Sequence, residues 1–161
     1  MIDQDPTLIK STFKENLDIT GKYTDEELEK TLRECNLWEV IEEKGGLESP
    51  VSNTSLSAGE KQLLCICRAF LKHSKIVLID EATANIDVKN DALIQKVIAE
   101  KFKSSTVLTI AHRLSTLQNS DKIMVMDQGK LAEFGHPKEL ENRSGGVYSE
   151  MMKKHQQEML K

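Results

Sequence analysis

Three short apolar runs separated by helical patterns constrain what this chain can fold into. The runs cover residues 76–79, 106–110 and 123–126, and a helical pattern over roughly 88–102 joins the first two. Strands that are apolar on both faces and alternate with helices are typical of a parallel sheet with helices on both sides. The sequence therefore predicts an α/β fold built on a parallel sheet.

Charged and imidazole side chains follow the first two runs at the points where the strands end. Asp80 and Glu81 follow 76–79 directly, and His112 comes two residues after Ile110. In open α/β sheets, ligands bind beyond the carboxyl ends of the strands. Paired carboxylates there can bind Mg²⁺ and supply a general base. Taken singly, each residue also has a structural explanation, as an acid that faces water or a hydrogen-bonded histidine.

A helix start with anion-binding character precedes the paired acids. The stretch Leu56-Ser57-Ala58-Gly59-Glu60 opens a helical pattern that is apolar on most sides, which predicts a buried helix. The backbone N–H groups and the positive dipole end at such a helix start attract an anion such as phosphate. Taken alone, Ser57 is equally well explained as an ordinary N-cap. Together with the paired acids, this helix start points to nucleotide hydrolysis.

The phosphate-binding loop that such chemistry uses is absent from the sequence. The motif G-x-x-x-x-G-K-[ST] occurs nowhere in the 161 residues. Both Gly-Lys pairs, Gly21-Lys22 and Gly129-Lys130, are followed by residues other than Ser or Thr. A chain of this length can form one domain with a sizeable core. The sequence therefore carries half of a nucleotide-hydrolysing site.

Charge and composition exclude several classes of protein. Acidic residues exceed basic ones by 26 to 22, for a net charge of −4, and no basic stripe indicates a nucleic-acid partner. No apolar run approaches the ~20 residues of a membrane span, and the N-terminus is no signal peptide, so we expect membrane contact only through other segments. Three cysteines provide no disulfide framework and favour a reducing compartment. Because Cys65 and Cys67 lie on different faces of one predicted helix, we expect core packing for them and for Cys35.

The other segments predict a helical first half and a hairpin near the end. Thr24 and Glu27 form a capping box at the start of a helix that carries Leu28, Leu32 and Cys35 on one side. The remaining predictions are a loop over 1–10, a short helix around 37–41, a turn at 127–130 into a strand over 131–134, a short helix from Pro137 and a terminal helix over 147–160.

Five motifs, in this order, resemble the nucleotide-binding domain of an ABC transporter. They are Gln4-Asp5-Pro6, LSAGEKQ at 56–62, the strand 76–81, ATANID at 82–87 and TIAHRL at 109–114. The details resemble most the second such domain of the multidrug-resistance-associated, C-type exporters, and the resemblance covers essentially the whole chain. It implies a P-loop NTPase-like parallel sheet flanked by helices, present here as its incomplete C-terminal part, with an α-helical signature subdomain.

The resemblance implies roles for four residues around the nucleotide, with ATP and Mg²⁺ as cofactors. Gln4 corresponds to the Q-loop residue that approaches Mg²⁺ and couples to the transmembrane part. Asp80 corresponds to the Walker B carboxylate that organises Mg²⁺ through water, and Glu81 to the general base that polarises the attacking water. His112 corresponds to the switch histidine that contacts the γ-phosphate.

The signature residues are implied to contact ATP held by a second domain. In the family, two nucleotide-binding domains form a head-to-tail sandwich around two ATP molecules. Ser57, Ala58, Gly59 and Glu60 correspond to the signature that binds the γ-phosphate, and Asp87 to the D-loop acid at the interface. Ala58 stands where the family usually has Gly, and Glu60 stands where it has Gln. Neither change indicates an inactive site.

The resemblance also implies a domain organisation and partners. The partners are a second nucleotide-binding domain and the transmembrane domains of a transporter, without nucleic acid. We expect the chain to act at the cytoplasmic face of a membrane, in ATP-driven export. The implied segments are a Q-loop segment at 1–10, the α-helical subdomain at 11–72, the catalytic α/β core at 73–136 and C-terminal helices at 137–161.

The front of the family's domain has no counterpart in this sequence. The adenine-stacking loop, the Walker A phosphate loop and the opening strands are all missing. We therefore expect the isolated chain to be inactive as an ATPase. We also expect one sheet edge and one apolar face to lie uncovered. These expectations favour the C-terminal part of a longer transporter, or the product of a truncated gene or gene model.

Two other functions stay open at this point. A non-catalytic fragment would only lend its signature face to the Walker A of a partner domain. A chromosome-maintenance ATPase of the SMC kind also carries a signature before an Asp-Glu strand. That second function is the weaker one, because the sequence has residues 111–114 and the Gln-Asp-Pro loop and lacks long coiled-coil heptads. The acidic balance also gives no support for DNA binding.

Overall fold

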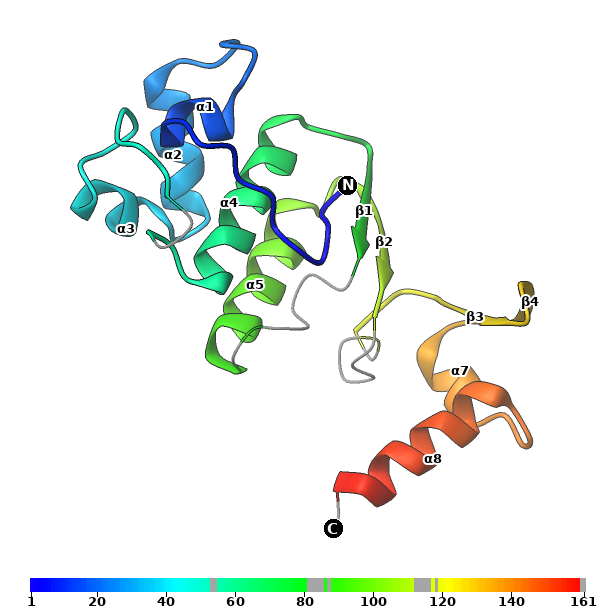
Figure 1. Ribbon diagram of the computed structural model, residues 1–161. Helices are drawn as coiled ribbons and strands as arrows, with labels where there is room; N and C mark the ends of the chain where they lie inside the picture. Colours follow the sequence, from blue (N-terminus) through cyan, green and yellow to red (C-terminus); the bar gives the residue numbers. More distant parts are fainter. Residues whose placement is uncertain (53–54, 81–85, 87, 112–116, 118, 160–161) are drawn as a thin grey trace. The chain divides into compact units, whose positions relative to one another are not determined.

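The computed structural model describes residues 1–52, 55–80, 86, 88–111, 117 and 119–159. The chain divides into two compact units, residues 1–110 and 111–161. Figure 1 shows helices and a small sheet in the first unit, and a hairpin and helices in the second. Among the described residues, no helix is long and apolar enough to cross a bilayer.

A parallel pair of strands forms the sheet of the first unit. β1 (Ile76–Asp80) pairs with β2 (Thr106–Ile110) in a register that places Asp80 opposite Ile110. α5 (Val88–Lys101) lies between them in the sequence, as expected because parallel neighbours need a crossover connection. The two strands and the helix between them are confirmed as predicted.

The N-terminal segment adds a bridge to the other edge of β1. The Ile2 N–H donates to the Leu78 carbonyl at 2.8 Å, and the Asp80 N–H donates to the Ile2 carbonyl at 2.9 Å. Ile2 thereby pairs in parallel with Ile79 and is buried. The prediction of a loop over 1–10 is wrong at Ile2, because one bridge leaves no periodic pattern in the sequence.

Helices cover one face of this sheet in the described part of the first unit. Val77 and Ile79 are buried in one apolar core with residues of α4 (Ala58–Leu71) and α5, which lie on the same side of the strands in Figure 1. Ile76 and Leu78, which alternate with them along β1, are 66% and 42% exposed. The alternation of strands and helices predicts helices on both faces of the sheet. In the described residues one face is exposed instead, as expected from the absence of the family's opening strands.

Three short helices pack beside α4 and enclose the rest of this core. α1 (Phe13–Leu17) and α2 (Asp25–Glu34) contact α4, and α3 (Trp38–Glu43) contacts α2. The predicted capping box of α2 is confirmed: the Thr24 hydroxyl accepts from the Glu27 N–H, and the Glu27 carboxylate accepts from the Thr24 N–H. The helical first half is therefore built as its local patterns predict.

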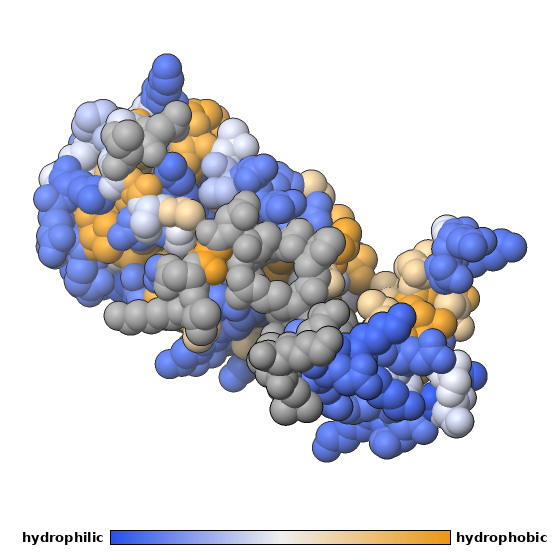
Figure 2. All heavy atoms as spheres, turned by 60° about the horizontal axis from the view of Figure 1, so that its bottom comes forward, coloured by the Kyte–Doolittle hydropathy of each residue, from blue (hydrophilic) through white to orange (hydrophobic). Residues whose placement is uncertain are grey.

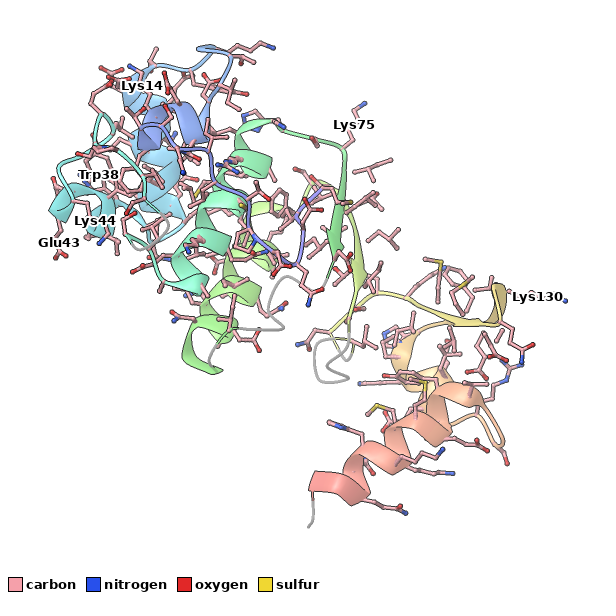
Figure 3. All side chains as sticks on the ribbon, viewed as in Figure 1. Lys14, Trp38, Glu43, Lys44, Lys75 and Lys130 are labelled. Carbon is pink, nitrogen blue, oxygen red and sulfur yellow. The ribbon has the colours of Figure 1, made fainter. Side chains whose placement is uncertain are left out.

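The cysteines and Trp38 contribute to the packing of the helical part. Cys35 and Cys67 are fully buried, as expected, whereas Cys65 on another face of α4 is half-buried. Trp38 lies among the side chains of the helical part in Figure 3, and the Arg33 guanidinium lies 5.1 Å from the centre of its ring. Burial raises the pKa of the Cys67 thiol well above its usual value, so this thiol packs as a small apolar group.

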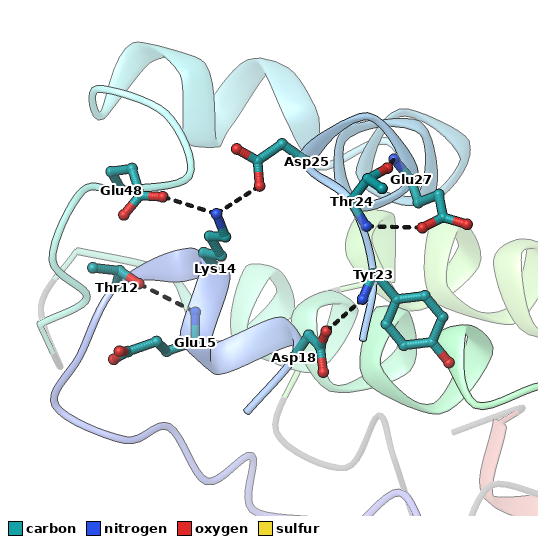
Figure 4. Close-up of polar contacts among 9 residues, drawn as sticks. All are labelled: Thr12, Lys14, Glu15, Asp18, Tyr23, Thr24, Asp25, Glu27 and Glu48. Atoms are coloured by element: carbon teal, nitrogen blue, oxygen red, sulfur yellow. Dashed lines mark hydrogen bonds and ion pairs between the residues drawn. The ribbon is translucent and has the colours of Figure 1, made fainter. Parts of the chain in front are cut away.

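α1 is the helix that the sequence patterns do not predict, since its five residues give too short a periodic signal. The Thr12 hydroxyl caps it by accepting from the Glu15 N–H at 3.1 Å. Lys14 of α1 pairs with Asp25 at 2.7 Å and with Glu48 at 3.2 Å (Figure 4). These contacts link α1 to α2 and to the loop that carries Glu48.

A hairpin forms the sheet of the second unit. β3 (Ile123–Asp127) pairs antiparallel with β4 (Lys130–Gly135). The two residues between them, Gln128 and Gly129, both have positive φ, as in the type I′ turns that suit hairpins. The predicted hairpin is confirmed. The sequence also predicts 123–126 as a further strand of a parallel sheet, but in the described residues β3 pairs with β4, because this tight turn reverses the chain.

α7 (Pro137–Glu141) and α8 (Val147–Met159) cover one face of the hairpin. The other face carries the cross-strand pairs Met124–Phe134 and Met126–Leu131, all of which are exposed. Figure 2 shows apolar surface on this part of the chain. The covered side is held by a small core of Ile123, Val125, Leu140, Tyr148 and Met152.

A turn after α1 holds the Asp18 carboxylate in several hydrogen bonds. The Tyr23 N–H donates to it at 2.8 Å (Figure 4). The hydroxyl and N–H of Thr20 donate to it at 2.8 and 3.1 Å. Burial raises the pKa of Asp18, but these hydrogen bonds lower it by more, so the folded-state pKa lies below the ordinary 3.8. Asp18 therefore stabilises the fold above its unfolded-state pKa, and this contribution is lost as the pH falls through the folded-state pKa.

Asp18→Asn should lower the free energy of unfolding at neutral pH by about 1 kcal/mol, because the N–H donors lose a charged acceptor. The difference from the unmodified chain should shrink below about pH 4, where the Asp18 carboxyl of the unfolded chain begins to bind a proton. Urea unfolding between about pH 3 and pH 7 measures the difference. Asp121→Asn, at an exposed acid, is the control. A difference that stays constant with pH would contradict this assignment.

Candidate functional site

The tip of α4 carries the predicted signature residues. Ser57 caps the helix, since its hydroxyl accepts from the Glu60 N–H at 3.3 Å, and the Glu60 carboxylate accepts from the Ser57 N–H at 2.6 Å. Ser57 and Ala58 are exposed, and Glu60 is half-buried. The tip therefore lies at the surface, with a carboxylate hydrogen-bonded at the helix end that favours anions.

Gly59 sets the spacing between this tip and α5. It is buried, and a Cβ added to it would lie 3.1 Å from the Cβ of Asn90. Carbon atoms in ordinary contact are about 3.5–4.0 Å apart, so a residue without a side chain lets α4 approach α5 this closely. Gly59 therefore helps to fix where the exposed Ser57 sits.

The carboxyl end of the sheet carries the two predicted metal-binding residues. Ile2 and Ile79 are paired in parallel, so the residues that follow them leave the sheet at the same edge. Asp80 is the last residue of β1 and is half-buried, whereas Gln4 comes two residues after Ile2 and is exposed. The backbone pairing thus places Gln4 and Asp80 at one edge of the sheet.

The donor atoms at this edge suit magnesium. Asp80 offers a carboxylate and Gln4 an amide oxygen, and protein-bound Mg²⁺ typically uses one or two carboxylates and keeps several waters. No group of three or more His, Cys, Asp or Glu side chains in the described ranges could hold a metal ion. One carboxylate and one amide oxygen would fit a partly hydrated Mg²⁺.

Three predicted site residues, Glu81, Asp87 and His112, lie outside the described residues. In the sequence, Glu81 follows Asp80 directly and His112 follows Ile110 by two residues. Asp80 and Ile110 are opposite one another in the β1–β2 register. Two of these three residues thus follow, in the sequence, the ends of neighbouring strands.

Two polar side chains of α4 that the sequence analysis does not single out hold the N-terminal segment. Gln62 Nε2 donates to the Asp3 carbonyl at 3.1 Å. Arg68 donates to the Thr7 carbonyl and to Asn16 Oδ1, both at 2.6 Å, and also to the Asn16 carbonyl. The available sequence signal was their polarity, because a polar residue in a buried helix needs hydrogen-bond partners.

A cavity of about 230 Å³ lies between the N-terminal segment and α4. Asp3, Asp5, Arg68 and Lys72 line it with the thiol of Cys65, and none of the described site residues does. Burial raises the pKa of the Cys65 thiol, although the Arg68 guanidinium opposes this shift. A thiol with a raised pKa is a poor nucleophile at neutral pH, so the cavity does not add a reactive group to the site.

An exposed, capped helix start and a sheet edge with oxygen donors thus lie in one α/β unit. The family model described as ABC transporter matches residues 1–84. Because this match covers just over half of the 161 residues, the chain belongs to the ABC transporter family. The match confirms the resemblance and the α/β, P-loop NTPase-like fold class, present here as part of a domain.

Curated relatives include members of ATP-binding cassette sub-family C. ATP-binding cassette sub-family C member 4 of Mus musculus is 49% identical over 140 residues, which cover 85% of this chain and 11% of that protein. The protein of the same name from Homo sapiens is 46% identical over 155 residues, or 94% of this chain and 12% of that protein. ATP-binding cassette sub-family C member 10 of Mus musculus is 42% identical over 159 residues, which cover 98% of this chain and 11% of that protein. The chain thus spans about a tenth of the length of these relatives.

Gly59→Ala should destabilise the chain by about 1 kcal/mol, although Ala is the better helix former, because its methyl group must displace the Asn90 side chain. Asn90→Gly removes the opposing Cβ, so Gly59→Ala should no longer destabilise in that background. Urea unfolding of the four proteins gives the coupling between the two positions. Equal effects of Gly59→Ala in both backgrounds would show that the contact between α4 and α5 at Asn90 does not cause the loss of stability.

Proposed function

We propose that this chain is part of a nucleotide-binding domain that couples ATP binding and hydrolysis to export across a membrane. The observation that carries the proposal is that one unit of an ABC-family chain has two features that suit parts of such a site. These features are the exposed, capped tip of α4 at Ser57 and the sheet edge with Gln4 and Asp80. Similarity to sub-family C members 4 and 10 supports a C-type exporter, and we propose that the chain acts at the cytoplasmic face of the membrane.

Residues of this chain would hold the metal and activate water. Asp80 and Gln4, at the sheet edge, would hold Mg²⁺, Glu81 would polarise the attacking water as general base, and His112 would contact the γ-phosphate. Phosphoryl transfer depends on positioning and charge neutralisation more than on covalent catalysis. Bound Mg²⁺ supplies part of that charge neutralisation. The division of roles follows the resemblance and the placement of Gln4 and Asp80 at one edge.

The tip of α4 serves a partner domain. Ser57, Ala58, Gly59 and Glu60 contact the γ-phosphate of an ATP molecule held by the Walker A loop of a second nucleotide-binding domain, in a head-to-tail pair. Asp87 lies at the interface of that pair. The exposure of Ser57 and Ala58 supports this role. Because the 161 residues contain no Walker A loop, the chain alone is expected to be inactive.

Two exposed apolar surfaces support the proposal that further segments complete the domain. One is the face of β1 with Ile76 and Leu78, and the other is the hairpin face with Met124 and Phe134. Contiguous exposed apolar surface often marks a site of interaction. We assign 1–10 to the Q-loop segment, 11–72 to the α-helical subdomain, 73–136 to the catalytic core and 137–161 to the C-terminal helices, with transmembrane domains as partners.

Glu81→Gln, in an intact transporter that contains this chain, tests the proposal. Loss of a general base should lower ATP turnover by roughly 10²–10⁴-fold and leave ATP affinity largely intact. Phosphate release measures turnover, and equilibrium binding of labelled ATP measures affinity. Hydrolysis at an unchanged rate would defeat the role of Glu81.

Glu100→Gln, at an exposed acid of α5, is the matched control and should change neither turnover nor affinity. The 161-residue chain by itself should bind ATP negligibly and release no phosphate. Turnover by the chain alone would overturn the proposal that its signature serves the ATP of a partner.

Glu60→Gln should lower the KM for ATP of the intact transporter about 3–10-fold. The Glu60 carboxylate lies 2.6 Å from the Ser57 nitrogen, so its charge lies beside the place proposed for the γ-phosphate. Gln keeps the capping box but removes a like charge, whose repulsion is on the order of 1 kcal/mol near water. ATP-dependent turnover measures KM. An unchanged or higher KM would show that Glu60 does not face the phosphate.

A further inference from the structure

We propose that Gln62 is a positioning residue, which fixes the backbone beside Gln4 so that the tip of α4 and the N-terminal segment move as one unit. The structural part of this proposal depends only on contacts within the first unit. Its effect on ATP turnover rests on the proposed function.

Gln62 makes the connection from inside the core. Its side chain is fully buried, and Nε2 donates to the Asp3 carbonyl at 3.1 Å. Asp3 directly precedes Gln4, whose own position is exposed. The contacts that hold the neighbours of Gln4 in the chain therefore set its place.

Three contacts hold this segment, and Gln4 lies among them. Ile2 is hydrogen-bonded to β1, the Asp3 carbonyl accepts from Gln62, and the Thr7 carbonyl accepts from Arg68 at 2.6 Å. Figure 1 shows the N-terminal segment passing along α4 toward β1. Two of the three contacts come from α4, so any movement of that helix is passed to the segment.

Packing alone does not explain a Gln at position 62, because the other polar atom of its side chain is a cost in the core. Its Oε1 is buried and has no hydrogen-bond partner among the described residues. A buried acceptor without a partner is destabilising, and an apolar side chain of the same length avoids that cost. The favourable contribution of Gln62 is therefore its N–H donation to Asp3, which holds the segment in place.

The same helix joins two parts of the proposed site. Ser57 caps α4 at its exposed tip, and Gln62 lies five residues further on, about 7.5 Å along the axis of a helix with a rise of 1.5 Å per residue. Phosphate contact at Ser57 would thus restrain Gln4 through α4 and Asp3. In this way the ATP of the partner domain would influence the metal site of this chain.

Gln62→Met in the 161-residue chain tests the structural part. Met has nearly the same length but no N–H donor, so the amides of Ile2 and Asp80, which bond across the N-terminal bridge, should exchange with solvent at least ~10-fold faster. The urea midpoint should stay the same or rise, because the unpartnered Oε1 is gone. Unchanged exchange of both amides would overturn the proposal, as would a lower urea midpoint together with faster exchange throughout α4.

Cys67→Ala is the matched control on another face of α4. Cys67 is fully buried, so loss of its side chain should lower the urea midpoint. It should leave the exchange of the Ile2 amide unchanged relative to its neighbours. Selectively faster exchange of the Ile2 amide in both variants would mean that Gln62 does not specifically hold the N-terminal segment, and would overturn the proposal.

Turnover in an intact transporter that contains this chain tests the functional part. Gln62→Met should lower kcat about 10-fold with little change in the KM for ATP, and adding Gln4→Ala should give no further loss beyond that of Gln4→Ala alone. Independent, multiplying losses would overturn the coupling of Gln62 to Gln4. Absence of turnover in the unmodified transporter would refute the proposed function instead, and the exchange experiment would then decide on Gln62.

Discussion

The burial of α4 is the constraint on which the rest of the first unit depends. Leu64, Ile66 and Cys67 are fully buried, in one core that includes both the helical part and the covered face of β1. A helix packed at this density cannot shift without disturbing its neighbours. The exposed cap at Ser57 and the segment bonded to Gln62 are therefore placed by the same packing, although they are far apart in the sequence.

The elements that could be predicted from the sequence are those with a local pattern. The capping box at Thr24 depends on residues three apart, and the strand that ends at Asp80 is a short apolar run beside a turn. The Gln128-Gly129 pair likewise predicts a turn between two strands, and the structure shows positive φ at both residues. Each of these signals needs only neighbours in the chain, so long-range packing does not alter it.

The features that could not be predicted depend on partners far away in the sequence. Ile2 joins the sheet through one bridge to β1, and Gln62 reaches Asp3 across 59 positions. Neither contact leaves a periodic pattern in the sequence. For the proposed site, the motif order predicts Asp80 and Gln4, but only the parallel bridge shows that they share an edge of the sheet. Which face of the sheet lies exposed likewise depends on what packs against it.

The hairpin face with Met124 and Met126 has a chemical consequence of its own. These side chains are 49% and 61% exposed, so peroxide can reach their thioethers. Oxidation to the sulfoxide makes such a side chain polar. In a preparation stored in air, that surface would then gradually become less apolar. The small core behind it, in which Tyr148 and Met152 are buried, would keep the hairpin folded.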